Sequence, residues 1–354
     1  MAILYSQLKF LRFQDHLNAL RDQKVVAPVH IRIKPTNRCN HNCWYCAYRV
    51  DNLQLGDGMD LEDEIPVDKM MQITDDIIAM GVKAVTFSGG GEPLLYKALP
   101  DVIDRLAGAG IKVAALSNGA NLRGRMADAF AEHGTWLRVS MDAWDDQSYQ
   151  QSRGAPVGGF PRLMRNLADF SARNSQCVLG ISFIVGKNNF DHIAEVAGML
   201  KEAGVNHMKI SGAVVDNEAA GNNLYHAEIQ AEVAAQINAA KRLEDGSFTV
   251  LNHYHDLEER FQKEYKTCAF LQFLTVIGAD QCVYTCQDKA YNAAGLLGSI
   301  KEQGFRQFWF SEENRKKLFS FDPSVSCGHH CVTHAKNLAI QEFLAIDPDH
   351  GMFV

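Results

Sequence analysis

The stretch CNHNCWYC at residues 39–46 contains three thiols, those of Cys39, Cys43 and Cys46. Thiolates are soft ligands that suit zinc, copper(I) or iron–sulfur clusters. A structural zinc site is closed by four ligands, and His41 would be the fourth in a zinc knuckle. A cubane cluster has four irons to coordinate, so three cysteines would leave one iron of a [4Fe–4S] cluster open to a substrate or cofactor. The motif alone leaves both kinds of site open.

Outward from this loop, strands and helices alternate along the chain. Residues 29–34 show strand alternation that ends at Pro35, shortly before the cysteine loop. Further strands are predicted at residues 84–88, 111–116, 135–141, 178–185 and 207–211. Predicted helices lie at residues 68–80, 98–109, 163–172 and 191–203, another follows the turn at residues 117–119, and one more is expected near residues 228–241. Six strands alternating with helices imply right-handed crossovers and a parallel sheet. They fall short of a closed eight-strand barrel, so we predict an α/β fold with a partial (β/α)6 barrel.

Polar residues and glycines follow several of these strands. In parallel α/β folds, functional sites lie at the carboxyl ends of the strands. Residues 89–93 read GGGEP, and the three glycines permit a turn whose backbone approaches a ligand closely. The alternative is that this turn simply ends a strand. The other strand-end residues that attract attention are Ser117, Asn118, Ser140 and Asp142.

Together, the cysteine loop after a first strand and Gly-Gly-Glu-Pro after a second resemble the radical S-adenosylmethionine (SAM) superfamily. The resemblance covers residues 28–215 and implies a partial barrel that is open on one side. In that family SAM chelates the open iron through its amino and carboxylate groups. One electron then cleaves SAM to methionine and a 5′-deoxyadenosyl radical, which takes a hydrogen atom from substrate. The resemblance implies that Cys39, Cys43 and Cys46 hold this catalytic cluster.

The same resemblance implies a set of SAM contacts. It suggests that the glycine turn receives the SAM amino group with Glu92 beside it, and that Tyr45 lies against the adenine. The planar guanidinium of Arg153 would meet the SAM carboxylate bidentately, with Ser140 nearby. The alternative for Arg153 is a surface salt bridge. The expected cofactor-binding residues are Tyr45, Gly89, Gly90, Glu92, Ser117, Asn118, Ser140, Asp142 and Arg153.

A second cysteine set lies near the C-terminus. It comprises Cys268, Cys282, Cys286, Cys327 and Cys331. Together with its surroundings it resembles the SPASM and twitch extensions of radical SAM enzymes, which hold an auxiliary [4Fe–4S] cluster. The resemblance matches four of the thiols to ligands of one auxiliary cluster, namely Cys268, Cys286, Cys327 and Cys331. The alternative is a zinc site assisted by His329, His330 or His334.

Cys282 is left over by this match. It lies four residues before Cys286 on a segment that reads as a strand, where side chains alternate, so both thiols can face the same side. The spacing therefore does not exclude Cys282 as a ligand, and whether it or Cys268 is the extra thiol stays open. As a non-ligand, Cys282 would be structural or a hydrogen-atom donor. A donor would make the net reaction an epimerisation, whereas electron transfer to the auxiliary cluster would make it an oxidation. Cys177, which precedes the fifth strand, is interpreted as a buried structural thiol.

The bulk composition limits the classes of partner. The chain has 354 residues, and 35 basic against 42 acidic side chains give a net charge of −7, which does not suggest a nucleic-acid partner. No apolar run is long enough to span a bilayer, and the first residues do not read as a signal peptide. Nine cysteines in this composition are better explained by metal than by disulfides, so we expect a reducing cytoplasm.

We expect four segments along the chain. Residues 1–27 are a short extension on the outside of the barrel, and residues 28–215 form the radical SAM core. Residues 216–260 are a connector, and residues 261–354 form a small α+β twitch- or SPASM-like iron–sulfur domain. The 27 leading residues are too few for the winged-helix module of many peptide maturases.

The predicted substrate is therefore a sugar or nucleotide-sugar of bacterial surface-carbohydrate biosynthesis, because parts of the sequence resemble relatives associated with those pathways. A peptide is the second candidate, as in maturases of ribosomal peptides or sulfatases. A reductant such as flavodoxin or ferredoxin would supply the electron. A remote alternative is a non-catalytic iron–sulfur or zinc protein, which would have no need of the SAM-binding residues.

Overall fold

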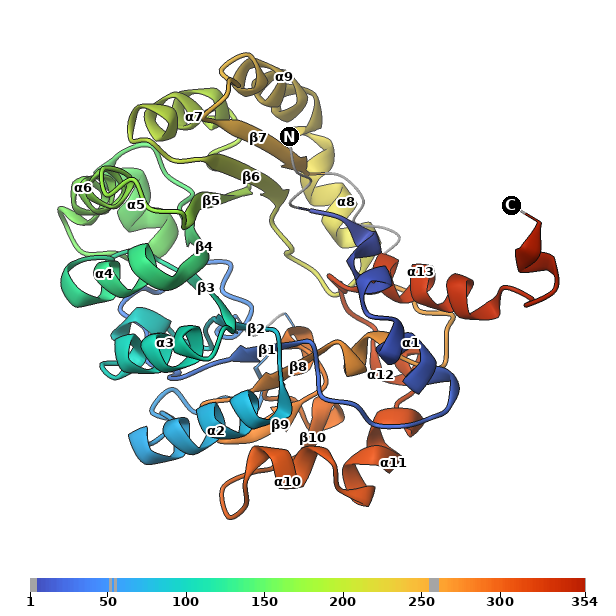
Figure 1. The fold of residues 1–354 in the computed structure, drawn as a ribbon. Helices are drawn as coiled ribbons and strands as arrows, with labels where there is room; N and C mark the ends of the chain where they lie inside the picture. Colours follow the sequence, from blue (N-terminus) through green and yellow to red (C-terminus); the bar gives the residue numbers. More distant parts are fainter. Residues whose placement is uncertain (1–4, 51–52, 54–55, 255–260, 354) are drawn as a thin grey trace.

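One curved sheet of ten strands organises the molecule (Figure 1). A computed structural model describes residues 5–50, 53, 56–254 and 261–353. Eight strands run parallel to one another, and the first seven along the chain are β1 (His30–Ile33), β2 (Ala84–Phe87), β3 (Lys112–Ser117), β4 (Gly134–Ser140), β5 (Val178–Val185), β6 (His207–Gly212) and β7 (Thr249–His253). The partial barrel expected from the sequence is confirmed, because the strand order β10-β9-β8-β1-β2-β3-β4-β5-β6-β7 does not close on itself.

Helices cover the outer face of this sheet (Figure 1). They are α2 (Val67–Met80), α3 (Leu99–Gly108), α4 (Gly124–His133), α5 (Asp146–Arg153), α6 (Gly159–Ser171), α7 (Ile193–Glu202) and α9 (Gln230–Lys241). Because strand side chains alternate, every second residue faces these helices, as Ile31, Ile33, Val139 and Ile181 do. Each such side chain, once fully buried, contributes roughly 1.5–3 kcal/mol. The intervening residues face the opposite side, which we call the inner face.

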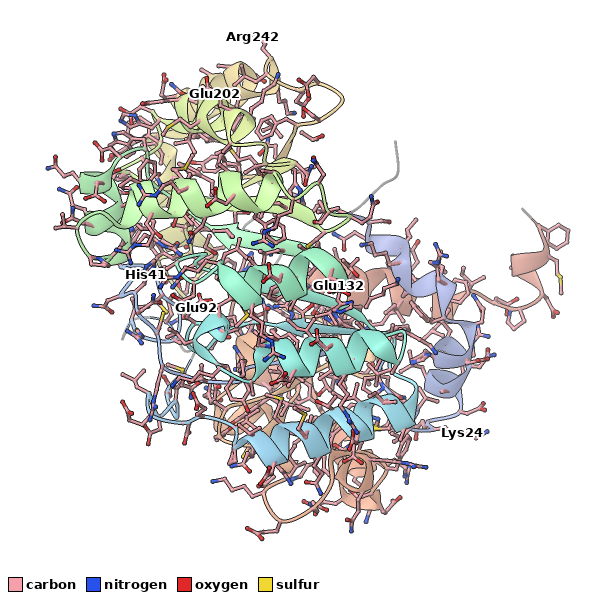
Figure 2. The ribbon with its side chains drawn as sticks, turned by 60° about the vertical axis from the view of Figure 1, so that its left-hand side comes forward. Lys24, His41, Glu92, Glu132, Glu202 and Arg242 are labelled. Atoms are coloured by element: carbon pink, nitrogen blue, oxygen red, sulfur yellow. The ribbon has the colours of Figure 1, made fainter. Side chains whose placement is uncertain are left out.

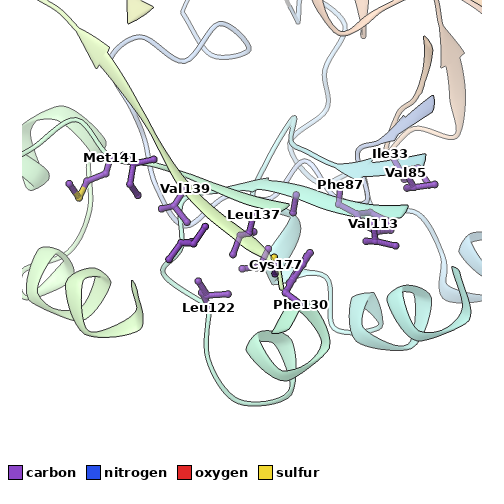
Figure 3. Packing of buried hydrophobic residues seen from close by; sticks show 14 of the residues in the cluster. Ile33, Val85, Phe87, Val113, Leu122, Phe130, Leu137, Val139, Met141 and Cys177 are labelled. Atoms are coloured by element: carbon purple, nitrogen blue, oxygen red, sulfur yellow. The ribbon is translucent and has the colours of Figure 1, made fainter. Parts of the chain in front are cut away.

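Cys177 belongs to the outer-face core. It is buried at 4% exposure among Phe130, Leu137 and other apolar side chains (Figure 3). Burial raises the pKa of its thiol to about 12. A Cβ added to Gly134 would lie 2.7 Å from its sulfur, so the thiol fills a tightly packed position, as expected of a structural cysteine.

The C-terminal region extends the same sheet. β8 (Leu274–Ile277) pairs with β1 in parallel, while β9 (Cys282–Tyr284) and β10 (Leu296–Ser299) add antiparallel strands. Short helices follow, α10 (Phe305–Trp309), α11 (Glu312–Ser320), α12 (Pro323–Ser326) and α13 (His334–Ala345). The expected α+β character is confirmed, and the pairing of β8 with β1 places the second cysteine set beside the first strand of the barrel.

Two segments differ from expectation. The connector contains the helix expected near residues 228–241, which is α9, but also α8 (Ala219–Ala227) and β7, which were not expected, and β7 adds a seventh parallel strand beside β6. β7 is short and ends in Asn252 and His253, and only Val250 in it is buried, so its strand pattern is weak. The placement of domain boundaries stays a prediction.

The N-terminal extension does not lie on the outer face. It forms η1 (Gln7–Arg12) and α1 (Gln14–Arg21). Phe10 and Leu17 form a separate apolar cluster with Phe273 and with Ile340 of α13. The extension therefore packs against the C-terminal region. No helix among the described residues meets the length and apolarity that crossing a membrane requires.

Candidate active site

The loop with Cys39, Cys43 and Cys46 follows β1, and all three thiols are free and half-buried. Backbone hydrogen bonds attach the loop to the end of α5. Asn42 N donates to the Arg153 carbonyl at 2.8 Å, and Trp44 N donates to the Ser152 carbonyl at 3.3 Å. The end of α5, which is distant in the sequence, therefore holds this loop in place.

The glycine turn lies directly against this loop. Gly91 N donates to the Thr36 carbonyl at 3.1 Å, and Glu92 N donates to the Arg38 carbonyl at 2.8 Å. A Cβ added to Gly91 would lie 2.0 Å from the Arg38 oxygen, and one added to Gly90 would lie 2.1 Å from Asn37 Oδ1. The need for glycine at these two positions thus comes from contact with the protein's own loop. Ligand contact by Gly89 and Gly90 stays a prediction.

Glu92 is buried at 3% exposure and joins the ends of β2 and β3. Its carboxylate accepts from Ser117 Oγ and Asn118 N, both at 2.6 Å, and from Leu94 N at 3.0 Å. Burial raises the pKa of this carboxyl group, and the three hydrogen bonds oppose that rise. Asn118 Nδ2 also donates to Asn40 Oδ1 at 2.7 Å, which connects this group to the cysteine loop. Figure 2 shows Glu92 and His41 of that loop on the same side of the molecule.

Tyr45, Asp142 and Arg153 meet in a second polar group, which we call the anchor trio. Asp142 Oδ2 accepts from Arg153 Nη1 at 2.7 Å and from the Tyr45 hydroxyl, and Arg153 Nη1 also contacts that hydroxyl. Asp142 Oδ1 accepts from Ile184 N at 2.7 Å. Arg153 is 3% exposed, so the surface salt bridge considered for it is wrong, and the pair with Asp142 is buried. Its Nε is buried without a hydrogen-bond partner in the described structure.

Ser140 ends β4, two residues before Asp142. It is half-buried on the inner face and lies opposite Ser182 of β5 in the strand register. The expected SAM contacts thus fall into three groups, built from the carboxyl ends of β2, β3 and β4, the loop after β1 and the end of α5. These are the glycine turn with Glu92, the anchor trio, and Ser140.

Sequence reasoning missed Lys34, which is 1% exposed. Its Nζ donates to the Gly89 carbonyl at 2.6 Å and to the Tyr48 hydroxyl at 2.7 Å. Tyr48 in turn donates to the Gln287 carbonyl at 2.8 Å, beside Cys286. Burial and the charge of Arg32 lower the pKa of Lys34 to about 7. Its place in an alternating strand, immediately before Pro35, was the available indication that it faces inward.

Four of the five C-terminal thiols line one cavity. Cys268 precedes η4 (Ala269–Gln272), Cys286 precedes η5 (Gln287–Lys289), Cys327 follows α12, and Cys331 precedes α13. Asn337 Nδ2 donates to Cys268 Sγ at 3.3 Å, and Thr333 Oγ1 lies 3.4 Å from Cys331 Sγ. Burial raises the pKa values of all four thiols.

Cys282 is not among the residues that line this cavity. It packs with Tyr48 and Met59 against a small apolar cluster that includes Tyr284 and Tyr291. Burial and the neighbouring Asp280 raise the pKa of its thiol to about 11.

Histidines near the two cysteine sets bear on the zinc alternatives. His41 packs its ring edge-on against Tyr149, and the centroids are 5.5 Å apart. His329 lines the C-terminal cavity, and neither of its ring nitrogens has a hydrogen-bond partner among the described residues. Within the described chain, one set of three such donor atoms lies within 4.8 Å of one another, and it consists of Cys286, Asp288 and His329. In a tetrahedral zinc site the ligand sulfurs lie about 3.8 Å apart. By this measure, the zinc alternative stays open in the described chain at the set around Cys286.

Comparison with known proteins identifies the family. The model of the radical SAM superfamily matches residues 33–212, about half of the chain. The chain belongs to the radical SAM superfamily. This radical SAM protein therefore uses a [4Fe–4S] cluster and SAM. The donor set fits that group, because three thiols on one loop are spread too widely to surround a single ion and lie beside the glycine turn and the anchor trio.

Curated relatives are similar in sequence to part of this radical SAM protein. A GTP 3′,8-cyclase of Synechococcus elongatus is 33% identical over 132 residues, which are 36% of this chain and 38% of that protein. An Fe-coproporphyrin III synthase of Methanosarcina barkeri is 26% identical over 168 residues, 47% of this chain and 39% of that protein. The chain thus spans less than half the length of these curated relatives.

The similarity in fold to solved structures extends over most of the chain. SuiB of Streptococcus suis, bound to S-adenosylmethionine, gives a TM-score of 0.64 at 15% identity and covers 95% of this chain and 78% of that chain. Native anSMEcpe with bound AdoMet gives 0.59 at 16% identity and covers 90% of this chain and 97% of that chain. At such identity the likeness shows the fold, including the C-terminal region.

Proposed function

We propose that Cys39, Cys43 and Cys46 hold the catalytic [4Fe–4S] cluster and that SAM binds between the glycine turn and the anchor trio. Together these cofactors supply one-electron cleavage of SAM, which gives the 5′-deoxyadenosyl radical that abstracts a hydrogen atom from substrate. A reductant such as flavodoxin or ferredoxin would deliver the electron in the cytoplasm.

The protein's own residues position this chemistry. Asp142 holds Arg153 so that its unpaired Nε is available for the SAM carboxylate. Glu92 fixes Ser117 and Asn118 against the cysteine loop. Tyr45 lies between two cluster cysteines in the sequence. Its hydroxyl donates a hydrogen bond to Asp142, and its ring would contact the adenine. These contacts would orient SAM before reduction rather than alter the chemistry of its cleavage.

We propose that Cys268, Cys286, Cys327 and Cys331 hold one auxiliary [4Fe–4S] cluster, and the observation that supports this is the cavity that all four line. Asn337 and Thr333 place hydrogen-bonding groups at two of the sulfurs, which is a way to tune a cluster's potential. A cluster closed by four protein ligands has no place for SAM. It would accept an electron from substrate or order the substrate.

The proposed substrate is a small polar molecule, a sugar or nucleotide-sugar that is oxidised or epimerised. The observation that carries this choice is the polar inner face of the sheet, which contributes Arg32, Arg138, Ser140, Ser182 and Lys209, each half-buried. A modification of peptides is the second candidate, because the fold resembles SuiB, which was solved bound to its precursor peptide SuiA.

A substrate panel tests this proposal. The anaerobically reconstituted protein, reduced with dithionite and supplied with SAM, is incubated separately with nucleotide-sugars and with short peptides. We expect 5′-deoxyadenosine to rise above the substrate-free level only with a sugar-containing compound, and a matching product to appear by mass spectrometry. Stimulation by peptides alone would replace the sugar proposal with the peptide one. Absence of any SAM cleavage would contradict both.

A further inference from the structure

Lys34 connects the first strand of the barrel with the glycine turn. It directly follows β1, and because Ile33 belongs to the outer-face core, alternation directs the Lys34 side chain to the inner face. Its ammonium group donates to the Gly89 carbonyl at 2.6 Å. The side chain is 1% exposed, so this contact lies within the protein. One of the glycines expected to meet SAM is therefore held by a buried side chain from the neighbouring strand.

Tyr48 extends this contact to the auxiliary site. Its hydroxyl accepts from Lys34 Nζ at 2.7 Å and donates to the Gln287 carbonyl at 2.8 Å. Gln287 begins η5 and directly follows Cys286, one of the four thiols that line the C-terminal cavity. We call residues 286–291 the auxiliary loop. Lys34 and Tyr48 thus form a continuous chain of hydrogen bonds from the glycine turn to this loop.

A second connection joins the same two segments. Tyr291 ends the auxiliary loop, and its hydroxyl donates to Asn37 Oδ1 at 2.6 Å. That amide oxygen lies 2.1 Å from the position that a Cβ on Gly90 would take, so Asn37 packs directly on the glycine turn. Tyr291 has a φ of 63°, in the left-handed region that a bulky side chain disfavours, and its carbonyl accepts from Gly58 N at 2.8 Å. The loop is thus connected to the turn at both of its ends.

These connections give the auxiliary site a way to affect SAM binding. When Cys286 is bound to a cluster, the start of the auxiliary loop is fixed. Residues 288–291 are buried, and a closely packed interior transmits a displacement rather than absorbing it. The orientation of the Gly89 carbonyl and the position of Gly90 then depend on whether the auxiliary site is filled. Two binding sites linked in this way affect each other's affinity reciprocally.

We propose that Lys34 and Tyr48 are positioning residues that couple the auxiliary site to the SAM site, so that SAM binds more tightly when the auxiliary cluster is in place. This inference rests on the proposed function and adds a role for two residues that bind neither cluster. Tyr48 lies two residues after Cys46, so the coupling acts on the loop of the catalytic thiols as well as on the glycine turn. Protein with an empty auxiliary site would bind SAM weakly, which limits SAM cleavage that is not coupled to substrate.

Calorimetric titration of anaerobically reconstituted variants with SAM tests the coupling. Cys286→Ala, which lacks the auxiliary cluster, should bind SAM roughly 5- to 150-fold more weakly than the wild type, the range usual for coupled sites. Cleavage at saturating SAM should continue, because the catalytic cluster keeps its ligands. Tyr48→Phe keeps the ring but removes both hydrogen bonds of the hydroxyl, so it should also weaken SAM binding. In the double variant Tyr48→Phe/Cys286→Ala the two losses should not multiply, because the first change already breaks the connection.

Two further variants separate positioning from general damage to the fold. Lys34→Met should weaken SAM binding as Tyr48→Phe does, because it removes the contact with Gly89. Lys201→Met is the matched control, since Lys201 of the outer helix α7 also donates to a backbone carbonyl, that of Leu243, at 2.8 Å. It should leave SAM affinity unchanged. The iron content and the thermal unfolding midpoint of every variant are measured in the same preparations.

Three outcomes would overturn the coupling. The first is equal SAM affinity of the wild type and of Cys286→Ala that has lost about four irons, in which case the proposed function stands without the coupling. The second is a double variant in which the two losses multiply, which would make Tyr48 and the auxiliary site independent. The third is Cys286→Ala that retains all of its iron, which would contradict the auxiliary cluster itself.

Discussion

The two cysteine sets differ in how the chain assembles them. Cys39, Cys43 and Cys46 lie on one loop after β1, so their spacing is set by local sequence. Cys268, Cys286, Cys327 and Cys331 come from four segments, and only the packing of η4, η5, α12 and α13 brings them to one cavity. A motif can therefore specify the first set, whereas the second exists only in the folded chain.

The surroundings of the two sets differ as well. The first is bordered by a glycine turn and by Arg153 with its unpaired Nε, which are groups suited to a ligand that comes and goes. The second is enclosed by protein groups such as Asn337, Thr333 and the buried Lys263, whose Nζ donates to the His329 carbonyl at 2.5 Å. The contrast supports the proposal that the first set is an exchangeable site and the second a closed site.

The largest expected effect comes from removing the local set. Replacing Cys39, Cys43 and Cys46 with alanine should remove about four irons per chain and abolish reductive SAM cleavage, because one cubane loses all of its protein ligands. Iron analysis and chromatography of 5′-deoxyadenosine provide the measurement. Cys177→Ala is the matched control and should retain all iron. SAM cleavage by the triple variant would refute the assignment.

The next effect concerns the closed set. Cys286→Ala should lose about four irons of the auxiliary cluster while uncoupled SAM cleavage continues, because the two sites have separate ligands. The competing hypothesis is a zinc site, because donor atoms of Cys286, Asp288 and His329 lie close together. His329→Gln separates the two, since it should leave the iron content unchanged if four thiols hold a cluster. Wild-type protein with one zinc and only about four irons would contradict the auxiliary cluster.

The difference between local and tertiary assembly also explains which helices, strands and site residues could be predicted from the sequence. β5 was predicted with its observed bounds, Val178–Val185, because a buried strand has a continuous apolar pattern. α5 was missed, since its eight residues are mostly polar, with Tyr149 the one large apolar side chain buried in it. That helix presents Arg153, so the residue was found only through its resemblance to a motif. Its burial against Asp142 depends on tertiary structure, as does the inward position of Lys34.

A smaller effect is expected from the anchor trio. Arg153→Lys keeps a cation beside Asp142 but removes the fork, so SAM affinity should fall by about 1.5–3 kcal/mol, roughly 10- to 150-fold. Arg153→Ala is less informative, because breaking a buried pair destabilises a fold by about 3–5 kcal/mol. Calorimetry with SAM on the reconstituted protein gives the affinity. The control is Arg125→Gln, because Arg125 is an exposed arginine of α4 that pairs with Asp101. Unchanged affinity would leave Arg153 a structural partner of Asp142 alone.

The smallest effect on the clusters is expected at Cys282. Because this thiol lies outside the cavity that the other four line, Cys282→Ala should keep both clusters in the iron count and in the low-temperature spin-resonance spectrum. Loss of about four irons per chain would make Cys282 a ligand and displace one of the four assigned thiols.

The fate of the substrate hydrogen then decides what Cys282 does. A donor thiol exchanges its hydrogen with solvent, so turnover in deuterated water would place deuterium in an epimerised product, and Cys282→Ala would stop forming that product. An oxidised product without solvent deuterium, made equally by wild type and variant, would instead assign the electron to the closed cysteine set. In that case the two cysteine sets have separate roles, because the exchangeable site generates the radical and the closed site accepts the electron.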